Sequence, residues 1–255
     1  MNDIDPELIS QAHDFADRLS QRIRRVLPDP QPQFLAQVLP GRSPSLVVWP
    51  VSTGDTELLP QPLTLVAQGR QIEQRLHLRV IYRCCADTSG QYLTIEESSL
   101  GLGLAAITDP LVRFEYQRAT PARSRLPAAH IQVHAHRDET VWLMLHGDEA
   151  RPAERWRRRR LPRMAEMHLP VGGDRYRPCL EDVLGLAITE FGASKRNGAW
   201  NALEEGRAEW RRFQLRAAVR DAPAVAAEEL RKQGWTVTPH ENANQSERTD
   251  RLGRP

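Results

Sequence analysis

Strict alternation of apolar and polar side chains constrains the fold of this chain more than any other feature. Between residues 75 and 82 every second side chain is large and apolar, and residues 112–117 repeat the pattern. A period of two is that of a β-strand with one buried face and one face in water. The alternation therefore predicts a sheet that is packed on one side and solvated on the other.

Seven such runs follow one another with only short turns between them. They are residues 46–51, 63–68, 76–84, 92–97, 112–117, 130–136 and 141–145. Because no helical segment intervenes, we expect consecutive strands to pair antiparallel, as in a meander. Apolar residues at helical spacing then follow in residues 180–191, 200–217 and 223–233. The predicted fold class is α+β, with an antiparallel meander-like sheet followed by C-terminal helices.

The segment 1–27 is predicted to be an amphipathic helix that precedes this domain. Asp5-Pro6 is a typical helix start, and apolar residues recur every three or four positions as far as Pro28. Five prolines in residues 28–44 exclude a continued helix or a central strand, so we interpret 28–45 as a Pro-rich linker and the helix as a separate arm. The remaining expected boundaries are a single α+β domain at 46–238, with strands at about 46–170 and helices at about 179–234, and a polar, disordered tail at 239–255.

Composition and charge exclude several classes of protein. With 255 residues, 40% of them hydrophobic, the chain can bury a substantial core. Its first residues lack the order of a signal peptide and no apolar run approaches the roughly 20 residues that span a bilayer, so we expect a cytoplasmic protein without membrane contact. Cys84, Cys85 and Cys179 supply neither a disulfide framework nor the paired cysteines of a zinc site. A net charge of +2 excludes a strong overall attraction to nucleic acid.

A row of histidines is the most distinctive chemical feature. Its members, which share one parity in a predicted strand, are His130, Gln132, His134 and His136. The residues between them are apolar, so the imidazoles are expected on one sheet face. Imidazole acts as general acid or base, contacts phosphate or binds metal. Zinc at this cluster is possible but not favoured, because no neighbouring carboxylate completes a ligand set, and no cofactor is predicted. The alternative is that the histidines only line a solvated face.

A second feature is a basic segment at residues 151–163. It holds seven arginines against a single glutamate and carries +6, whereas the rest of the chain carries −4. Prolines near both ends indicate an exposed loop, which is expected to contact the phosphate of an anionic partner or, alternatively, to be merely solvated. The phosphate-binding candidates are Arg157, Arg158, Arg159 and Arg160, together with Arg175 and Arg177 just before the helix at 180.

Two further patterns are not favoured as sites. Gly101-Leu-Gly103-Leu-Ala-Ala106 fits the dinucleotide pattern GxGxxA, but Asp109-Pro110 stops any helix that could meet a pyrophosphate. The carboxylates of Asp109 and Glu115 have a spacing that also occurs in metal nucleases, but such spacings are common by chance.

The order of motifs between about residues 110 and 188 adds a resemblance. A basic and aromatic strand at 113–116 is followed by the histidine row, by His168 before Leu-Pro-Val-Gly-Gly, and by Pro178-Cys-Leu-Glu-Asp-Val-Leu opening a helix. This order resembles that of the small TumE-type toxins of two-gene toxin–antitoxin operons. The strands before residue 110, the helices after 192 and the insert at 147–163 depart from the family.

The resemblance implies a cytoplasmic effector that acts on nucleic acid and is held by an antitoxin-like protein partner. It places the working residues at His130, His134, His136 and, as a further candidate, His168. The hypothesis is a metal-independent, ribonuclease-like enzyme acting on RNA or a nucleotide, with these histidines as general acid and base. The alternative is a non-catalytic module that binds a protein partner through the helices at 200–233 and the N-terminal helix. The sequence leaves open whether the protein is an enzyme.

Overall fold

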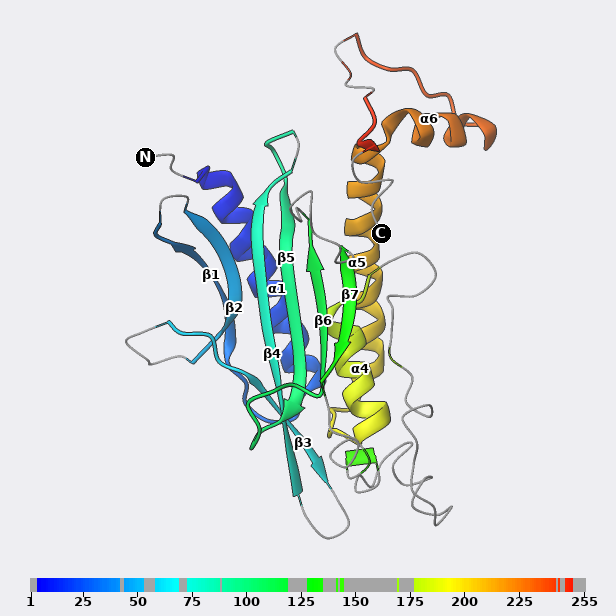
Figure 1. The fold of residues 1–255 in the computed structure, drawn as a ribbon. Coiled ribbons are helices and arrows are strands. Elements are labelled where there is room, and N and C mark those ends of the chain that lie inside the picture. Colours follow the sequence, from blue (N-terminus) through cyan, green and yellow to red (C-terminus); the bar gives the residue numbers. More distant parts are fainter. Residues whose placement is uncertain are drawn as a thin grey trace.

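The computed structural model describes residues 4–41, 44–52, 58–68, 73–87, 89–118, 128–134, 141, 143–144, 169, 177–241, 243 and 246–249. Within these ranges the named elements run from an N-terminal helix through seven strands to C-terminal helices. Figure 1 shows the strands as a single twisted sheet with helices against it. The predicted α+β class with an antiparallel sheet is confirmed.

Helix α1, Pro6–Val26, begins and ends where the sequence chemistry requires. The side chain of Asp5 accepts a hydrogen bond of 2.9 Å from the backbone N–H of Glu7, and Pro6 occupies the first turn, where its missing N–H costs nothing. Leu27 is already extended because the following residue is a proline. One stripe of the helix is buried: Leu8, Ala12, Ala16, Leu19, Ile23 and Val26.

All strand pairs of the sheet are antiparallel. The strands are β1 Gln33–Leu39, β2 Ser45–Val51, β3 Leu63–Gln68, β4 Glu73–Ala86, β5 Leu93–Leu104, β6 Val112–Gln117 and β7 Ala129–Val133. Their order is β1-β2-β4-β5-β6-β7. The 14-residue β4 is long enough to pair with β3 through its first half and with β2 through its second half, along the same edge.

The two faces of the sheet differ in burial, as the alternation predicts. Along β4 every second residue from Gln74 to Cys84 is buried, and the intervening residues are exposed or half-buried. Helices α1, α4 (Leu180–Phe191) and α5 (Ala199–Asp221) lie against the buried face (Figure 1). The other face of β4 carries Arg, His and Glu side chains.

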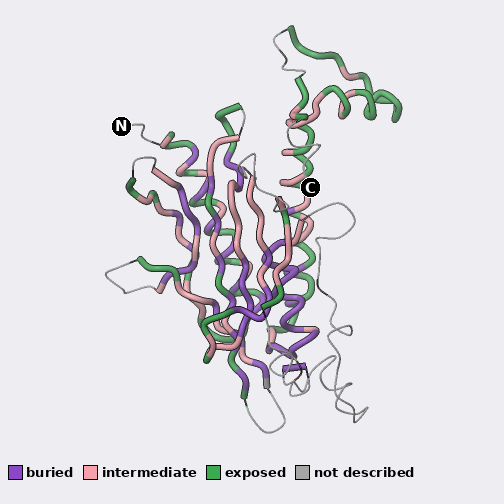
Figure 2. The backbone as a smooth tube through the Cα atoms, viewed as in Figure 1, coloured by how far each residue is buried: buried purple, intermediate pink, exposed green. Residues whose placement is uncertain are grey.

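The C-terminal helices differ from one another in burial. Almost all of α4 is buried, and it ends at Gly192, whose φ of 70° is readily adopted only by glycine. Helix α5 buries residues only in its first half, the last of them being Trp210. Helix α6, Pro223–Lys232, buries none and projects from the end of α5 beyond the sheet (Figures 1 and 2).

The predicted linker at 28–45 is wrong in one respect, because residues Gln33–Leu39 form strand β1. The five prolines lie on either side of this strand and none lies within it, so the strand keeps its backbone donors. Helix α1 packs on β1 and β2, so it is not a separate arm. The domain boundaries and the disordered tail at 239–255 stay predictions.

The predicted strand at 141–145 is also wrong. Val141, Leu143 and Met144 have helical backbone, and the adjacent Leu143 and Met144 are both fully buried. The helical backbone, and not an alternating strand, brings these two neighbours into the core. The predicted strand at 92–97 is instead the longer β5. Gly101 and Gly103 within β5 leave room for Pro110, whose Cα lies 3.0 Å from where a Cβ of Gly103 would be.

Candidate functional site

Strands β6 and β7 bring a carboxylate to the histidine row. Their antiparallel register places Glu115 directly opposite His130 and Arg113 opposite Gln132. Oε2 of Glu115 lies 3.2 Å from Nε2 of His130, whose side chain is only 14% exposed. From the sequence alone, Glu115 is a candidate only as a metal ligand of a nuclease. The partner of His130 was missed because the register between two strands is not visible in the sequence of either.

The contacts continue along β7 towards solvent. Nε2 of His130 lies 3.4 Å from Nε2 of Gln132, and Oε1 of Gln132 lies 3.1 Å from Nε2 of His134. At the other end, Nη1 of Arg113 lies 3.6 Å from Oε1 of Glu115. We call these five residues, Arg113, Glu115, His130, Gln132 and His134, the histidine-row site.

The amide of Gln132 selects the chemistry of His134. Since Oε1 of Gln132 is an acceptor, it receives the Nε2 proton of His134 and leaves Nδ1 of that ring as the basic nitrogen. His134 is exposed, and its backbone N–H is fixed by a 2.9 Å hydrogen bond to the carbonyl of Leu111. When His130 carries a proton on Nε2, that nitrogen donates it to Glu115 and cannot also accept from the amide nitrogen of Gln132. The site therefore pairs an accessible base with a carboxylate-bound imidazole.

Several predicted site residues lie outside the described residues. They are His136, His168, Arg157, Arg158, Arg159, Arg160 and Arg175. The apolar set between the histidines is only partly in the core, because Ile131 packs against it whereas Val133 is 48% exposed.

Arg177 lies on the opposite face of the sheet from the histidines. Its guanidinium carbon is 3.7 Å from the ring centre of Tyr116 and 5.7 Å from that of Trp210. Burial lowers the pKa of Arg177. Glu115 and Tyr116 are neighbours in a strand, so their side chains point to opposite faces. The structure therefore does not bring Arg177 to His130.

The described residues contain no cluster of three or more His, Cys, Asp or Glu side chains placed to hold a metal ion. Cys84 is buried, and burial raises the pKa of its thiol to about 12. Burial likewise raises the pKa of Cys179, which lies against Asp182 at the start of α4. A buried thiol with a raised pKa is a poor nucleophile at neutral pH.

A cavity between α1 and α5 was missed in the sequence. Its volume is about 300 Å³. Aromatic and aliphatic side chains from both helices and the sheet form its apolar wall: Phe15, Leu19, Tyr82, Leu93, Ile95, Trp210 and Phe213. Such a wall has no sequence signature beyond ordinary core periodicity, because the residues come from four separate elements.

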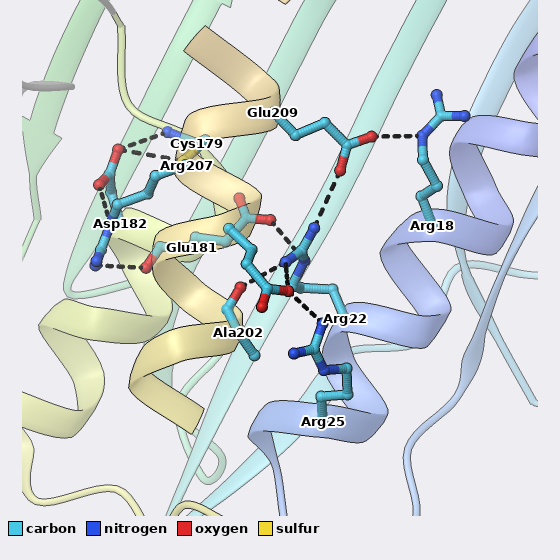
Figure 3. Close-up of polar contacts among 10 residues, drawn as sticks. Arg18, Arg22, Arg25, Cys179, Glu181, Asp182, Ala202, Arg207 and Glu209 are labelled. Carbon is cyan, nitrogen blue, oxygen red and sulfur yellow. Dashed lines mark hydrogen bonds and ion pairs between the residues drawn. The ribbon is translucent and has the colours of Figure 1, made fainter. Parts of the chain in front are cut away.

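Ion pairs form the other wall of this cavity (Figure 3). Arg22 of α1 contacts Glu209 at 3.0 Å and Glu181 at 3.6 Å, and it donates to the carbonyl of Ala202 at 2.6 Å. Nε of Arg18 pairs with Glu209 at 2.9 Å. Burial raises the pKa of Glu181, against the opposing charge of Arg22. These contacts fix α1 onto α5 and α4.

Protein-family models, curated proteins and solved structures were each compared with the chain, and none of them matches it. The resemblance to TumE-type toxins thus stays a prediction. Among the helices in the described part of the chain, none combines the length and the apolar character needed to cross a membrane.

Proposed function

We propose that the protein cleaves single-stranded RNA at the histidine-row site without a metal ion. The observation that carries the proposal is the contact of Glu115 with His130, continued through Gln132 to the exposed His134. Two imidazoles held in one line on an open face supply the base and the acid that transfer of an RNA phosphodiester requires.

In this reaction Nδ1 of His134 takes the proton of the 2′-hydroxyl, and the 2′-oxygen bonds to the adjacent phosphorus. The bond from phosphorus to the 5′-oxygen breaks, and protonated His130, whose Nε2–H stays on Glu115, gives its Nδ1 proton to that oxygen. The products are a 2′,3′-cyclic phosphate and a 5′-hydroxyl. Glu115 orients His130, and Arg113, on the same face, donates to the phosphate oxygens as charge accumulates there.

The proposal agrees with two expectations from the sequence. The TumE-type resemblance implies action on nucleic acid by an effector with an antitoxin-like partner. The arginines at 157–160 are the expected phosphate contacts further along the RNA, and a salt-sensitive interaction is their expected contribution.

The test uses the purified full chain and a fluorescently labelled single-stranded RNA in the presence of EDTA. We expect cleavage by the wild type and a loss of at least about 100-fold in His134→Gln, the range of one general base. The matched control is His13→Gln, because His13 is an exposed histidine on α1, away from the row. Circular dichroism melting confirms that each variant is folded.

An unchanged cleavage rate in His134→Gln, or no cleavage by the wild type, contradicts the proposal. Glu115→Gln supplies a second criterion, because it keeps a hydrogen-bond acceptor for His130 but removes the charge. We expect Glu115→Gln to lose less of the cleavage rate than His134→Gln. Equal losses of cleavage in His13→Gln and His134→Gln would show that the effect is not specific to the histidine row and would also contradict the proposal.

A second candidate function is binding of a protein partner, and the exposure of α6 favours it. Val225 and Leu230 on this helix and Trp235 just after it are 54%, 40% and 66% exposed. Large apolar side chains exposed on an unburied helix are typical of an interaction surface. Co-expression with the product of the neighbouring gene tests this function. A complex that is lost in Leu230→Ser and kept in Arg212→Ser supports it, whereas no complex, or equal effects, contradicts it.

A further inference from the structure

The cavity between α1 and α5 lies on the helix-covered face, opposite the histidine-row site. Tyr82 of β4 forms part of its wall, and Phe15 of α1 packs edge-on to Tyr82 with 5.2 Å between ring centres. Trp210 of α5 lies 6.1 Å from Tyr82, and Phe213 lies 6.2 Å from Trp210. The interior is therefore a set of ring faces and edges that favours a flat apolar group.

Hydrogen-bond donors of the wall remain unused. Trp210 is only 8% exposed, and its buried Nε1 has no hydrogen-bond acceptor among the described residues. A buried indole N–H usually has a partner, and an unsatisfied buried donor costs about 1–3 kcal/mol. Arg18 uses Nε on Glu209, and the described residues supply no partner for its terminal Nη groups (Figure 3).

A further cation lies at the rim. Arg216 of α5 lines the cavity, is exposed, and forms no ion pair within the described ranges. By contrast, most carboxylate acceptors of the cavity wall already have a partner. Glu209 binds both Arg18 and Arg22, and Glu181 faces Arg22. Asp14, at the exposed rim, has no ion-pair partner among the residues described.

We propose that this cavity binds a small aromatic carboxylate. The ring of the ligand lies against Phe15, Trp210 and Phe213, and the carboxylate accepts hydrogen bonds from Arg216 and the Nη groups of Arg18. Arginine forms its strongest hydrogen bonds with such planar anions. A volume of about 300 Å³ lies at the small end of ligand cavities and limits the ligand to one or two fused rings.

Calorimetry of the full chain with 2-naphthoate tests the proposal, because the probe has two fused rings and one carboxylate. The neutral 2-naphthamide and the cationic 2-naphthylmethylamine have the same ring system. We expect 2-naphthoate to bind at least about tenfold more tightly than the amide, and the amine to bind most weakly. Equal affinity for the three probes, or no binding of 2-naphthoate, would overturn the proposal.

Variants locate the bound probe. Arg216→Ala is expected to weaken 2-naphthoate about tenfold and to leave 2-naphthamide unchanged. Arg212→Ala is the matched control, since Arg212 is exposed on the same helix but does not line the cavity. Leu93→Trp fills the cavity and is expected to abolish binding of both probes. If Arg216→Ala and Arg212→Ala weakened the binding of 2-naphthoate equally, the proposed binding site would be wrong. His134→Gln leaves probe binding unchanged, so the outcome is separate from that of RNA cleavage.

Discussion

Gly206 on α5 is the residue at which the packing of the helices is tightest. A Cβ at this position would lie 2.7 Å from both Cγ and Cδ of Glu181 and closer still to Oε1. Real Cβ atoms do not approach other atoms so closely, and the buried carboxylate cannot move without breaking its contact with Arg22. The absence of a side chain at Gly206 is therefore what lets α5 pass over Glu181.

Gly206→Ala is accordingly expected to destabilise the protein by about 1–3 kcal/mol, although alanine is the better helix former. Urea unfolding monitored by circular dichroism measures the change. A double-mutant cycle with Glu181→Ala tests the cause, because the cost should largely disappear once the carboxylate is removed. A stabilised Gly206→Ala would show that the two helices are further apart than described.

The buried charge of Glu181 gives a second prediction at this scale. Because burial raises its pKa above the ordinary 4.5, the folded state holds more protons than the unfolded state between 4.5 and the folded pKa. The free energy of unfolding therefore falls as pH rises through this window. We expect Glu181→Gln to gain stability relative to the wild type between pH 4 and pH 7, measured by urea unfolding at each pH.

Glu205 provides the control of opposite sign. It is exposed, and a hydrogen bond from Arg25 lowers its pKa below 4.5, so its contribution to stability is present above that pH and lost as pH falls through the folded pKa. Glu205→Gln should thus lose stability relative to the wild type as pH rises to about 4.5. If the stability of both variants, relative to the wild type, changed in the same direction with pH, Glu181 would not have the raised pKa that its burial predicts.

At the scale of elements, the sequence predicted the helices and strands whose capping residues or alternation lie within the segment itself. The helix at 6–26 and the strand at 112–117 were predicted closely, because capping residues and alternation lie within the segment. Strand β1 could not be predicted from the proline content of residues 28–44, because all five prolines lie outside Gln33–Leu39. The contact between Glu115 and His130 could not be predicted, since it depends on the register of β6 against β7.

The helices α1 and α6 are expected to respond differently to the same kind of truncation. Ile23 of α1 is 1% exposed within the main core, whereas Leu230 of α6 is 40% exposed. Ile23→Ala should cost about 2–5 kcal/mol in the free energy of unfolding, and Leu230→Ala about 0.5 kcal/mol or less. Chemical denaturation of both variants measures this, and a small effect of Ile23→Ala would restore the interpretation of α1 as a separate arm.

At the scale of the whole molecule, the sheet separates two surfaces of different chemistry. The open face carries the histidine-row site, in which His130 and Glu115 are half-buried and His134 is exposed, and the covered face carries the aromatic cavity between α1 and α5. Arg177 belongs to the covered face, where it lies on Tyr116. Under the proposed function, nucleic acid is expected on the open face, where the histidine-row site lies.

The most direct test of the proposed function is the chemical identity of the RNA ends that the full chain produces in EDTA, determined by mass spectrometry. In-line attack by a 2′-hydroxyl activated by His134 predicts 2′,3′-cyclic phosphate and 5′-hydroxyl ends with the wild type and with His13→Gln, and their loss with His134→Gln. Ends bearing a 5′-phosphate, the same products from His134→Gln, or intact RNA with the wild type would contradict an acid–base site at the histidine row.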